Sequence, residues 1–296
     1  MPFRKKKIFI RNETKAFIFL MKTFDISQKE AQKWIDKKRV FVNGKVLVKK
    51  AALIKGEVEV SLYEPNPIGL KPIFQTEDFA IFDKPSGLLV HPKNRETQHS
   101  LTDEVRALFG KEANITHRID RETSGIVLCS KKKEAEIFFK KAFEEKKIKK
   151  GYLALVKGKM EKEILIKAPI LKNRKFQKIK LKVTIDEKGK YAETLIKPLK
   201  FLEEKNATLI EAIPVTGRQH QIRVHMFHVK HPILGDPIYG TDFETAEKYL
   251  NGELTEEERV KKTGANRIML HAWWIEFNYK GLKYKIYSKN GFTSLF

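Results

Sequence analysis

With 296 residues, the chain is long enough to bury a substantial core and to form one large domain with a small one attached. Its 60 Lys and Arg residues outnumber 37 Asp and Glu residues and give a formal net charge of +23. Such an excess favours a polyanionic partner, with nucleic acid ahead of an anionic membrane surface. A solvated cationic surface is the alternative, because many of the lysines are scattered along the chain.

The single cysteine, Cys129, excludes an internal disulfide, and its apolar surroundings indicate a buried thiol rather than a nucleophile. The sequence suggests neither a zinc site nor an iron cluster. The apolar run of residues 16–21 is too short for a secretory signal, and no other stretch is long enough to cross a membrane. We therefore expect a cytoplasmic protein.

The first part of the chain predicts a helix, a hairpin and a strand. Residues 27–30 (SQKE) have the pattern of a capping box, in which the Ser27 hydroxyl and the Glu30 carboxylate bind free amides at a helix start. Residues 39–48 (RVFVNGKVLV) are two β-branched runs around Asn-Gly, a strong hairpin signal. Another strand is expected at residues 56–60, and prolines follow at 65 and 67. These features predict two domains, 1–64 and 65–296.

The second domain reads as many short strands with few helices. Strands are expected at residues 78–83 and 152–156, and several more over 164–213, with polar breaks at 172–174 and 187–190. One amphipathic helix is expected between Ser130, as its N-cap, and residue 147, with its phenylalanines in the core. Helices and strands do not alternate regularly, so the fold class predicted is α+β, a mixed and largely antiparallel sheet with flanking helices and a basic cleft.

In residues 117–128 (HRIDRETSGIVL), a polar and charged stretch leads directly into an apolar strand. A loop supported by a buried strand is a frequent place for catalytic groups. His117 and Asp120 are candidates for that role, and a hydrogen-bonded structural turn is the equal alternative.

A second polar segment, residues 216–225 (TGRQHQIRVH), gathers hydrogen-bond donors in one place. A cation from it beside Asp120 would keep that carboxylate ionised. The alternative is a phosphate-binding patch without catalysis. A metal site at His220 and His225 lacks a third nearby ligand, so no metal is expected.

Five segments together resemble the RluA-type pseudouridine synthase family: residues 84–92 (KPSGLLVHP), 117–125, Tyr152 in its strand, 217–225, and 231–240 (HPILGDPIYG). Their order and spacing cover roughly residues 70–280. Within the first domain, residues 40–45 (VFVNGK) resemble the core of an S4 RNA-binding module. This arrangement is similar to that of family members that modify large-subunit ribosomal RNA.

The resemblance implies that Asp120 is the nucleophile in the isomerisation of uridine to pseudouridine, that Arg223 pairs with it, and that Tyr152 faces the flipped uracil. It also implies that no cofactor is needed. Arg118 is expected to enter the space left by the flipped base. Further RNA contacts are expected from a set of basic residues that comprises Arg121, Arg218, Lys38, Arg39 and Lys45.

Other matching positions are expected to have structural roles. His117 would support the catalytic loop. Five residues would set turns or allow close approach of backbones, namely Pro85, Gly87, Gly125, Gly217 and Gly235.

Three other functions stay open at this point. The same chemistry on transfer RNA is one, and a noncatalytic RNA-binding or ribosome-assembly factor is another. The third, a carbohydrate glycosidase, would need a second carboxylate, whereas arginines flank Asp120. The expected partner is structured RNA, most of all ribosomal RNA, with no membrane and no metal, and the expected state is a monomer.

Overall fold

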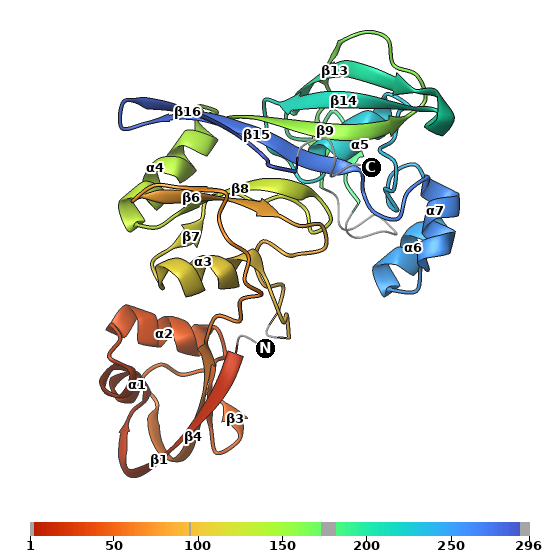
Figure 1. Ribbon diagram of the computed structural model, residues 1–296. Coiled ribbons are helices and arrows are strands. Elements are labelled where there is room, and N and C mark those ends of the chain that lie inside the picture. Colours follow the sequence, from red (N-terminus) through yellow and green to blue (C-terminus); the bar gives the residue numbers. More distant parts are fainter. Residues whose placement is uncertain (1–2, 95, 173–181, 291–296) are drawn as a thin grey trace. The chain divides into compact units, whose positions relative to one another are not determined.

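The computed structural model describes residues 3–94, 96–172 and 182–290, shown as a ribbon in Figure 1. The chain divides into two compact units. Unit 1 comprises residues 1–68 and 92–99, and unit 2 comprises residues 69–91 and 100–296. Residues 92–99, which the sequence analysis placed in the second domain, therefore group with the first unit.

Unit 1 is a four-stranded antiparallel sheet with two helices, in the strand order β1-β4-β2-β3. Its elements are β1 (Phe3–Lys15), α1 (Ala16–Phe24), α2 (Gln28–Asp36), β2 (Val40–Val42), β3 (Lys45–Val46) and β4 (Leu53–Tyr63). The Ser27 hydroxyl caps α2 by accepting from the Glu30 amide at 3.2 Å, which is one half of the predicted capping box. The hairpin is confirmed, because Asn43 and Gly44 both have the positive φ that its turn requires.

Two elements of unit 1 lie outside the sequence prediction. The apolar run at residues 16–21 belongs to α1, which buries Ala16 and Leu20 in the core of the unit. Strand β1 pairs with β4 along most of its length, although its many charged residues hide any alternating pattern. Ile10 is the one residue of β1 that is buried, so β1 offers little apolar surface and pairs with β4 mainly through backbone hydrogen bonds.

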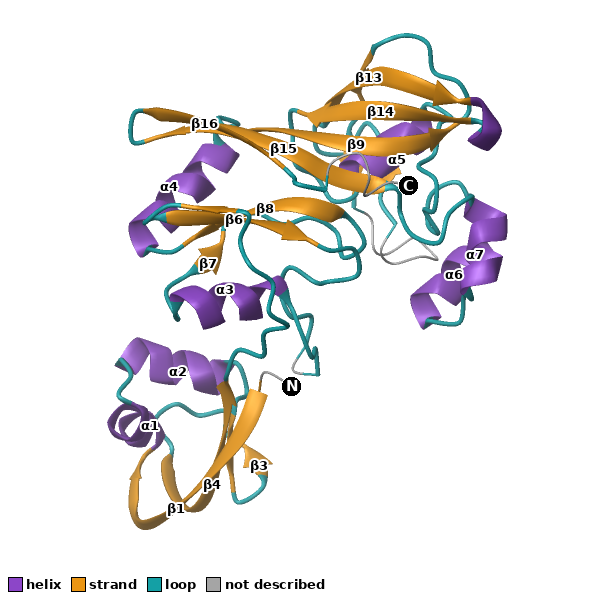
Figure 2. Ribbon diagram, in the orientation of Figure 1, coloured by secondary structure: helices purple, strands orange, loops and turns teal. Residues whose placement is uncertain are grey.

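Unit 2 is built on a mixed sheet in which the described strands follow the order β10-β13-β14-β9-β15-β8-β6-β5, with β16 on β15 and β7 on β8. Figure 2 shows this sheet with helices around it. Its strands are β5 (Phe74–Gln75), β6 (Phe79–Lys84), β7 (Asn114–Ile115), β8 (Ser124–Ser130), β9 (Lys149–Lys157), β10 (Ile164–Lys167), β13 (Glu193–Leu202), β14 (Ala207–Pro214), β15 (Leu270–Tyr279) and β16 (Leu282–Tyr287).

Neighbouring strands of this sheet run antiparallel except β15 and β8, which are parallel, so the predicted α+β class with a largely antiparallel sheet is confirmed. A separate small pair is formed by β11 (Ile170–Leu171) and β12 (Thr184–Ile185). The predicted polar break at 172–174 falls mostly on residues 173 and 174, which lie outside the described residues.

Helices pack on both faces of the unit 2 sheet. The helices α3 (Leu101–Phe109) and α5 (Gln221–His228) contribute to the core on one face, and α4 (Lys133–Glu144) contributes to the core on the other. The predicted N-cap of α4 was wrong: Ser130 stays in β8, where its hydroxyl donates to the Asn114 carbonyl, and Lys132 is the N-cap. The prediction for its phenylalanines was also partly wrong, because Phe139 is buried whereas Phe138 is 41% exposed.

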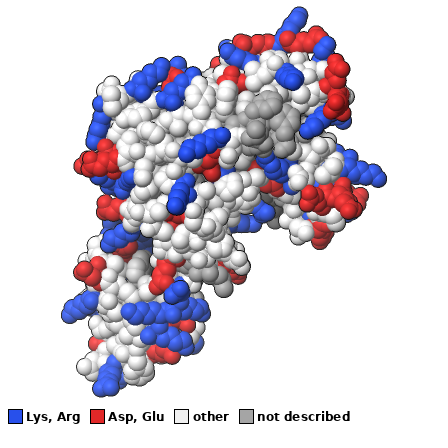
Figure 3. All heavy atoms as spheres, viewed as in Figure 1, with Lys and Arg blue, Asp and Glu red and all other residues white. Residues whose placement is uncertain are grey.

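A helical hairpin precedes the closing strand β15. It consists of α6 (Phe243–Asn251) and α7 (Glu256–Thr263), whose N-caps are Asp242 and Thr255. Both helices carry acidic residues in their first turns, which favours them electrostatically. On the face drawn in Figure 3, Asp and Glu side chains gather over these helices, while Lys and Arg side chains are spread over many elements.

The parallel contact between β8 and β15 depends on Gly125. Its φ is +105°, and a Cβ there would collide with the backbone of Ala272, so this close approach was predicted correctly. The prediction for Gly217 was wrong, since its φ is not positive and a Cβ would meet only the Lys150 ammonium group, at 3.4 Å. Within the described part of the chain, no helix is long and apolar enough to span a membrane.

Candidate active site

The loop of residues 116–123 joins β7 to β8 and is held from several sides. The Lys84 ammonium group, fully buried, donates to the carbonyls of Pro85, Leu88 and Arg121 at 2.8–2.9 Å. The Ser86 hydroxyl donates to the Glu122 carbonyl at 2.6 Å, and the Gly87 amide donates to the Arg121 carbonyl. The segment of residues 84–87 thus fixes the backbone on the C-terminal side of Asp120.

Lys84 is an unusual anchor because burial lowers its pKa to about 7, with Asp120 acting in the opposite direction. His117 fixes the other end of the loop. Its Nε2 accepts from the Leu128 amide at 3.0 Å, which places its proton on Nδ1, and burial lowers its pKa to about 3. A histidine held neutral in this way supports the loop, as the sequence predicted.

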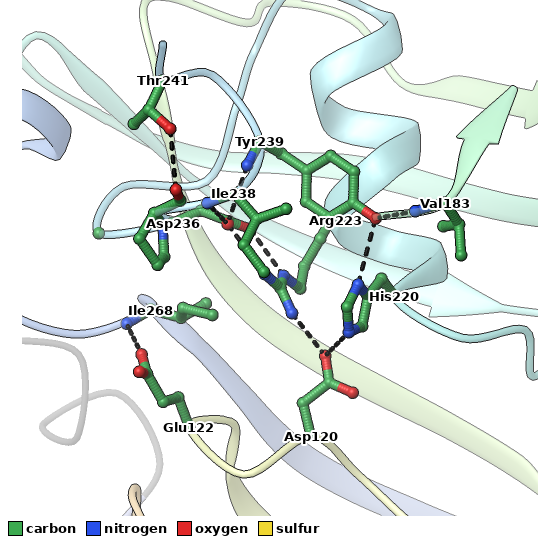
Figure 4. Close-up of polar contacts among 12 residues, drawn as sticks. Asp120, Glu122, Val183, His220, Arg223, Asp236, Ile238, Tyr239, Thr241 and Ile268 are labelled. Atoms are coloured by element: carbon green, nitrogen blue, oxygen red, sulfur yellow. Dashed lines mark hydrogen bonds and ion pairs between the residues drawn. The ribbon is translucent and has the colours of Figure 1, made fainter. Parts of the chain in front are cut away.

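The Asp120 carboxylate faces Arg223, which lies on α5. Arg223 Nη1 is 3.0 Å from Asp120 Oδ2, and Asp236 holds the same guanidinium through Nε at 2.7 Å and Nη2 at 2.9 Å. The Arg223 side chain is 4% exposed and that of Asp120 is 28% exposed. The pair is therefore buried on the arginine side and open on the aspartate side. Figure 4 shows both carboxylates directed at the guanidinium.

The charges around Asp120 keep it ionised. Burial acts to raise its pKa, but His220, Arg223 and Arg118 outweigh that effect and hold the pKa below its usual value. His220 itself is neutral at neutral pH, since burial and Arg223 lower its pKa to about 4. Arg223 and Arg118 are consequently the cations that stabilise the Asp120 anion at neutral pH, and Arg223 is the one that donates a hydrogen bond to it.

His220 connects Asp120 to a tyrosine. Its Nε2 lies 3.9 Å from Asp120 Oδ2, and its Nδ1 lies 3.1 Å from the Tyr239 hydroxyl, which accepts from the Val183 amide at 2.9 Å. These contacts are visible in Figure 4. Asp236 and Tyr239 belong to residues 231–240, a segment that resembles the family, but no role was predicted for either residue. The sequence signal for these two residues was their position in that segment. The fold is what places them behind Arg223 and His220.

Tyr152 lies on β9 with its side chain largely buried, and it lines the same cavity as Asp120. Burial raises its pKa, and the negative charge of Asp120 acts in the same direction. The phenol is therefore protonated at neutral pH and is available as a hydrogen-bond or proton donor.

The cavity at Asp120 has a volume of about 420 Å³, within the usual range for a bound small molecule or nucleotide. Its walls come from the 116–123 loop, the C-terminal end of α4, β9, residues 214–218 at the end of β14, α5 and the start of β15. It is lined by His117, Arg118, Ile119, Asp120, Thr123, Phe143, Glu144, Lys146, Ile148, Lys150, Tyr152, Pro214, Val215, Thr216, Gly217, Arg218, His220, Gln221, Ile222, Arg223 and Leu270.

Several lining residues were not predicted from the sequence, and two of them form a contact in the cavity wall. Phe143, assigned to the core, lines the cavity and packs on the His117 ring at 4.7 Å between centroids. The Lys150 ammonium group lies 5.6 Å from the centre of the Phe143 ring, and burial lowers its pKa. The spacing of apolar residues predicted the helix that carries Phe143 and the strand that carries Lys150. It did not predict which end of each element meets the cavity.

The predicted RNA-binding residues fall in different places. Arg118 and Arg218 are exposed and line the cavity, and Arg218 Nε donates to the Tyr191 carbonyl at 3.0 Å. Arg121 is exposed beside Asp120 but is absent from the cavity lining. The other three belong to unit 1: Lys38 and Lys45 are exposed, and the Arg39 guanidinium lies over the Phe3 ring.

The expected gathering of hydrogen-bond donors at residues 216–225 was only partly right. His225 points into the interior, where Nδ1 contacts the Thr194 hydroxyl and Nε2 contacts the Ala168 carbonyl. Helix α5 places it on a different side from His220. Among residues 3–94, 96–172 and 182–290, no group of three or more His, Cys, Asp or Glu side chains is arranged to hold a metal ion.

The site is a carboxylate that is held by a buried arginine at the edge of a basic cavity, on a mixed sheet. This arrangement indicates the active site of an enzyme. Residues 78–228 match the model of the family described as RNA pseudouridylate synthase. The chain belongs to this family, whose members are isomerases that act on RNA.

The relatives agree. An uncharacterized RNA pseudouridine synthase of Helicobacter pylori (strain J99) is 38% identical over 289 residues, which is 97% of this chain and 96% of that protein. The ribosomal large subunit pseudouridine synthase D of Nitrosomonas europaea is 31% identical over 274 residues, covering 86% of this chain and 73% of that protein. A solved structure, human RNA pseudouridylate synthase domain containing 1, shares the fold with a TM-score of 0.60 and 22% identity, covering 77% of this chain and 86% of that one.

Proposed function

We propose that Asp120 is the nucleophile with which this enzyme converts uridine to pseudouridine in large-subunit ribosomal RNA. One observation carries the proposal: the Asp120 carboxylate opens into the cavity while its partner, Arg223, is buried and held by Asp236. An anion that is fixed in direction and still accessible is what nucleophilic attack on a bound nucleotide requires.

The reaction needs no co-reactant, because it is an isomerisation. The bond between C1′ of the ribose and N1 of uracil breaks, the uracil turns, and a bond forms between C1′ and C5. The proton on C5 is lost, and N1 gains one. Asp120 takes part by attack at either C1′ or the uracil ring, and the protonated Tyr152 lies in the same cavity, where it can act in proton transfer.

The uridine must leave the base stack to reach Asp120, because C1′ and C5 are inaccessible within a helix. A cavity of about 420 Å³ suits a single extruded nucleotide. Arg118, which is exposed at the rim next to Asp120, would occupy the space that the base leaves. Cations at the rim also favour binding of the RNA backbone, because the phosphates that they contact release their condensed counterions.

The choice of ribosomal RNA is supported by the name of the Nitrosomonas europaea relative and by the character of unit 1. We propose that unit 1 is an S4-like RNA-binding module, in which the β2–β3 hairpin presents Lys45 and the turn after α2 presents Lys38. The substrate would then be bound in the cytoplasm by two basic units of one chain. We expect a monomer, which sedimentation of the purified protein checks.

The test is release of tritium from RNA labelled at uracil C5, with ribosomal RNA, assembling large subunits and transfer RNA in parallel. The variants are Asp120→Asn and, as the matched control, Glu204→Gln, which removes an exposed carboxylate in the short 3-10 helix η1 (Glu203–Lys205) between β13 and β14. Release from ribosomal RNA that disappears only in Asp120→Asn supports the proposal.

Other outcomes would change it. Release from transfer RNA alone would keep the chemistry and reject the ribosomal substrate. Full activity of Asp120→Asn would reject Asp120 as the nucleophile.

A further inference from the structure

Glu122 lies two residues after Asp120 and is bound by groups from three other segments. Its carboxylate accepts from the Tyr249 hydroxyl at 2.6 Å and from the Ile268 amide at 3.3 Å. Arg259 contacts both of its oxygens, through Nη1 at 3.2 Å and through a short bond from Nη2. Figure 4 shows that Glu122 and Asp120 rise from the same loop toward different partners.

Arg259 lies on α7 and has a second partner on another segment. Its Nη2 and Nε both donate to the Gly235 carbonyl, at 2.6 and 3.2 Å. The backbone at Gly235 is tightly constrained, because its φ is +77° and a Cβ there would collide with the Arg267 carbonyl. Arg259 is itself 9% exposed, so its guanidinium is almost fully used within the protein.

The two groups that Arg259 contacts are connected to the two residues of the active-site ion pair, Asp120 and Arg223. Glu122 belongs to the loop that bears Asp120, and Gly235 directly precedes Asp236, which orients Arg223. Arg223 in turn meets Asp120 at 3.0 Å. The contacts therefore form a closed ring, from Asp120 through Glu122, Arg259, Gly235, Asp236 and Arg223 back to Asp120.

We propose that Arg259, acting through Glu122 and Gly235, is a positioning residue that sets the distance and direction between Asp120 and Arg223. The proposal rests on the proposed function of Asp120. Arg259 lies outside residues 78–228, the part of the chain that matches the family, and none of the five segments that resemble the family contains it. The α6–α7 hairpin thus serves the reaction without contributing to the cavity lining.

A positioning role predicts an effect on the chemical step rather than on RNA binding. Displacement of a reacting group by about 1 Å is enough to cost on the order of a hundredfold in rate. Substrate affinity should hardly change, because neither Glu122 nor Arg259 lines the cavity. The acid limb of the kcat profile is a second readout, because it follows Asp120, which is faced by Arg223, His220, Arg118, Lys84, Tyr152 and Tyr239.

The experiment measures kcat and KM for the full-length variants Arg259→Ala, Arg259→Lys and Glu122→Gln, with Lys261→Ala on the exposed face of α7 as the matched control. Circular dichroism at the assay temperature reports the folded fraction. Arg259→Ala is also assayed with millimolar guanidinium chloride, and with sodium chloride as the control for ionic strength.

We expect kcat per folded molecule to fall by about tenfold to a hundredfold in Arg259→Ala, with KM within threefold of the parent and partial recovery with guanidinium but not sodium. The kcat values of Glu122→Gln and Arg259→Lys should lie between those of the parent and of Arg259→Ala. The acid limb of their kcat profiles should move to higher pH. These two variants keep size or charge, so they decide the question if Arg259→Ala does not fold.

Folded Glu122→Gln and Arg259→Lys proteins with kcat within twofold of the parent would overturn the proposal. So would a loss confined to KM. An active Asp120→Asn protein would instead remove the proposed function, so the two failures are distinguishable.

Discussion

Asp236 holds the guanidinium of Arg223 through two hydrogen bonds, from Nε at 2.7 Å and from Nη2 at 2.9 Å. The two side chains are 0% and 4% exposed. This paired contact leaves Nη1 as the nitrogen that faces Asp120, so the direction of the active-site cation is decided behind the cavity rather than in it.

Replacing Asp236 with asparagine should therefore affect both stability and activity. Neutralising one of the two carboxylates beside a buried guanidinium leaves its charge only partly compensated, by Asp120, so we expect a loss of about 3 kcal/mol in the free energy of unfolding. The reorientation of Arg223 should lower kcat by about a hundredfold. Urea unfolding and tritium release measure the two effects. Glu204→Gln, which also removes one carboxylate but on an exposed turn, should change neither.

The neutral state of His117 predicts a pH dependence of stability. Its pKa falls from 6.5 to about 3 on folding, first through burial and second through Lys150. The unfolded chain thus binds this proton more readily, so the contribution is present above pH 6.5 and is lost as the pH falls toward 3. Between pH 7 and 5 we expect a loss of about 2 kcal/mol that is missing in His117→Gln.

The measurement is urea unfolding at the two pH values in a Trp34→Phe background, so that fluorescence reports only Trp273 and Trp274 of unit 2. His228→Gln replaces an exposed histidine and serves as the control. Equal pH dependence in the parent and in His117→Gln would contradict the prediction.

The parallel contact of β8 with β15 predicts a large effect of Gly125→Ala. The new methyl group would collide with the Ala272 backbone, and the φ of +105° is unfavourable for alanine. We expect a loss of about 2 to 5 kcal/mol, from backbone strain and overpacking together. Gly281→Ala separates the two causes, since its φ is +78° but a Cβ there would have open space. Thermal unfolding at similar temperatures in both variants would show that the structure relieves the collision, and it would contradict the prediction.

Lys150 predicts an effect on RNA binding. Its ammonium group lines the cavity beside Phe143, where a phosphate of the extruded nucleotide would gain from its charge. Lys150→Met should raise KM and reduce by about 1 the slope of log affinity against log salt. Lys162→Met, at an exposed position outside the cavity lining, is the matched control, and filter binding at several salt concentrations measures both. An unchanged slope would place Lys150 away from the RNA backbone.

Local sequence signals determined a good part of this protein. The Ser27 cap, the hairpin at Asn43 and Gly44, and the strand that carries Tyr152 follow from interactions within a few residues, which is why they could be predicted. The family resemblance predicted Asp120 as the nucleophile and Arg223 as its partner, and the structure places the two side chains 3.0 Å apart in one cavity. Errors arose where a longer-range contact prevailed, as at Ser130, which the Asn114 carbonyl keeps within β8.

The tertiary structure alone decided which groups surround Asp120. Arg223 is 103 residues from it in the sequence, and Arg259 is 137 residues from Glu122. No local pattern specifies such partners, because they meet only after the sheet has paired β8 with β15 and α5 has packed on its face. The sequence alone thus supplied the reactive groups and the elements that carry them, while global packing set their distances, their burial and their charge states.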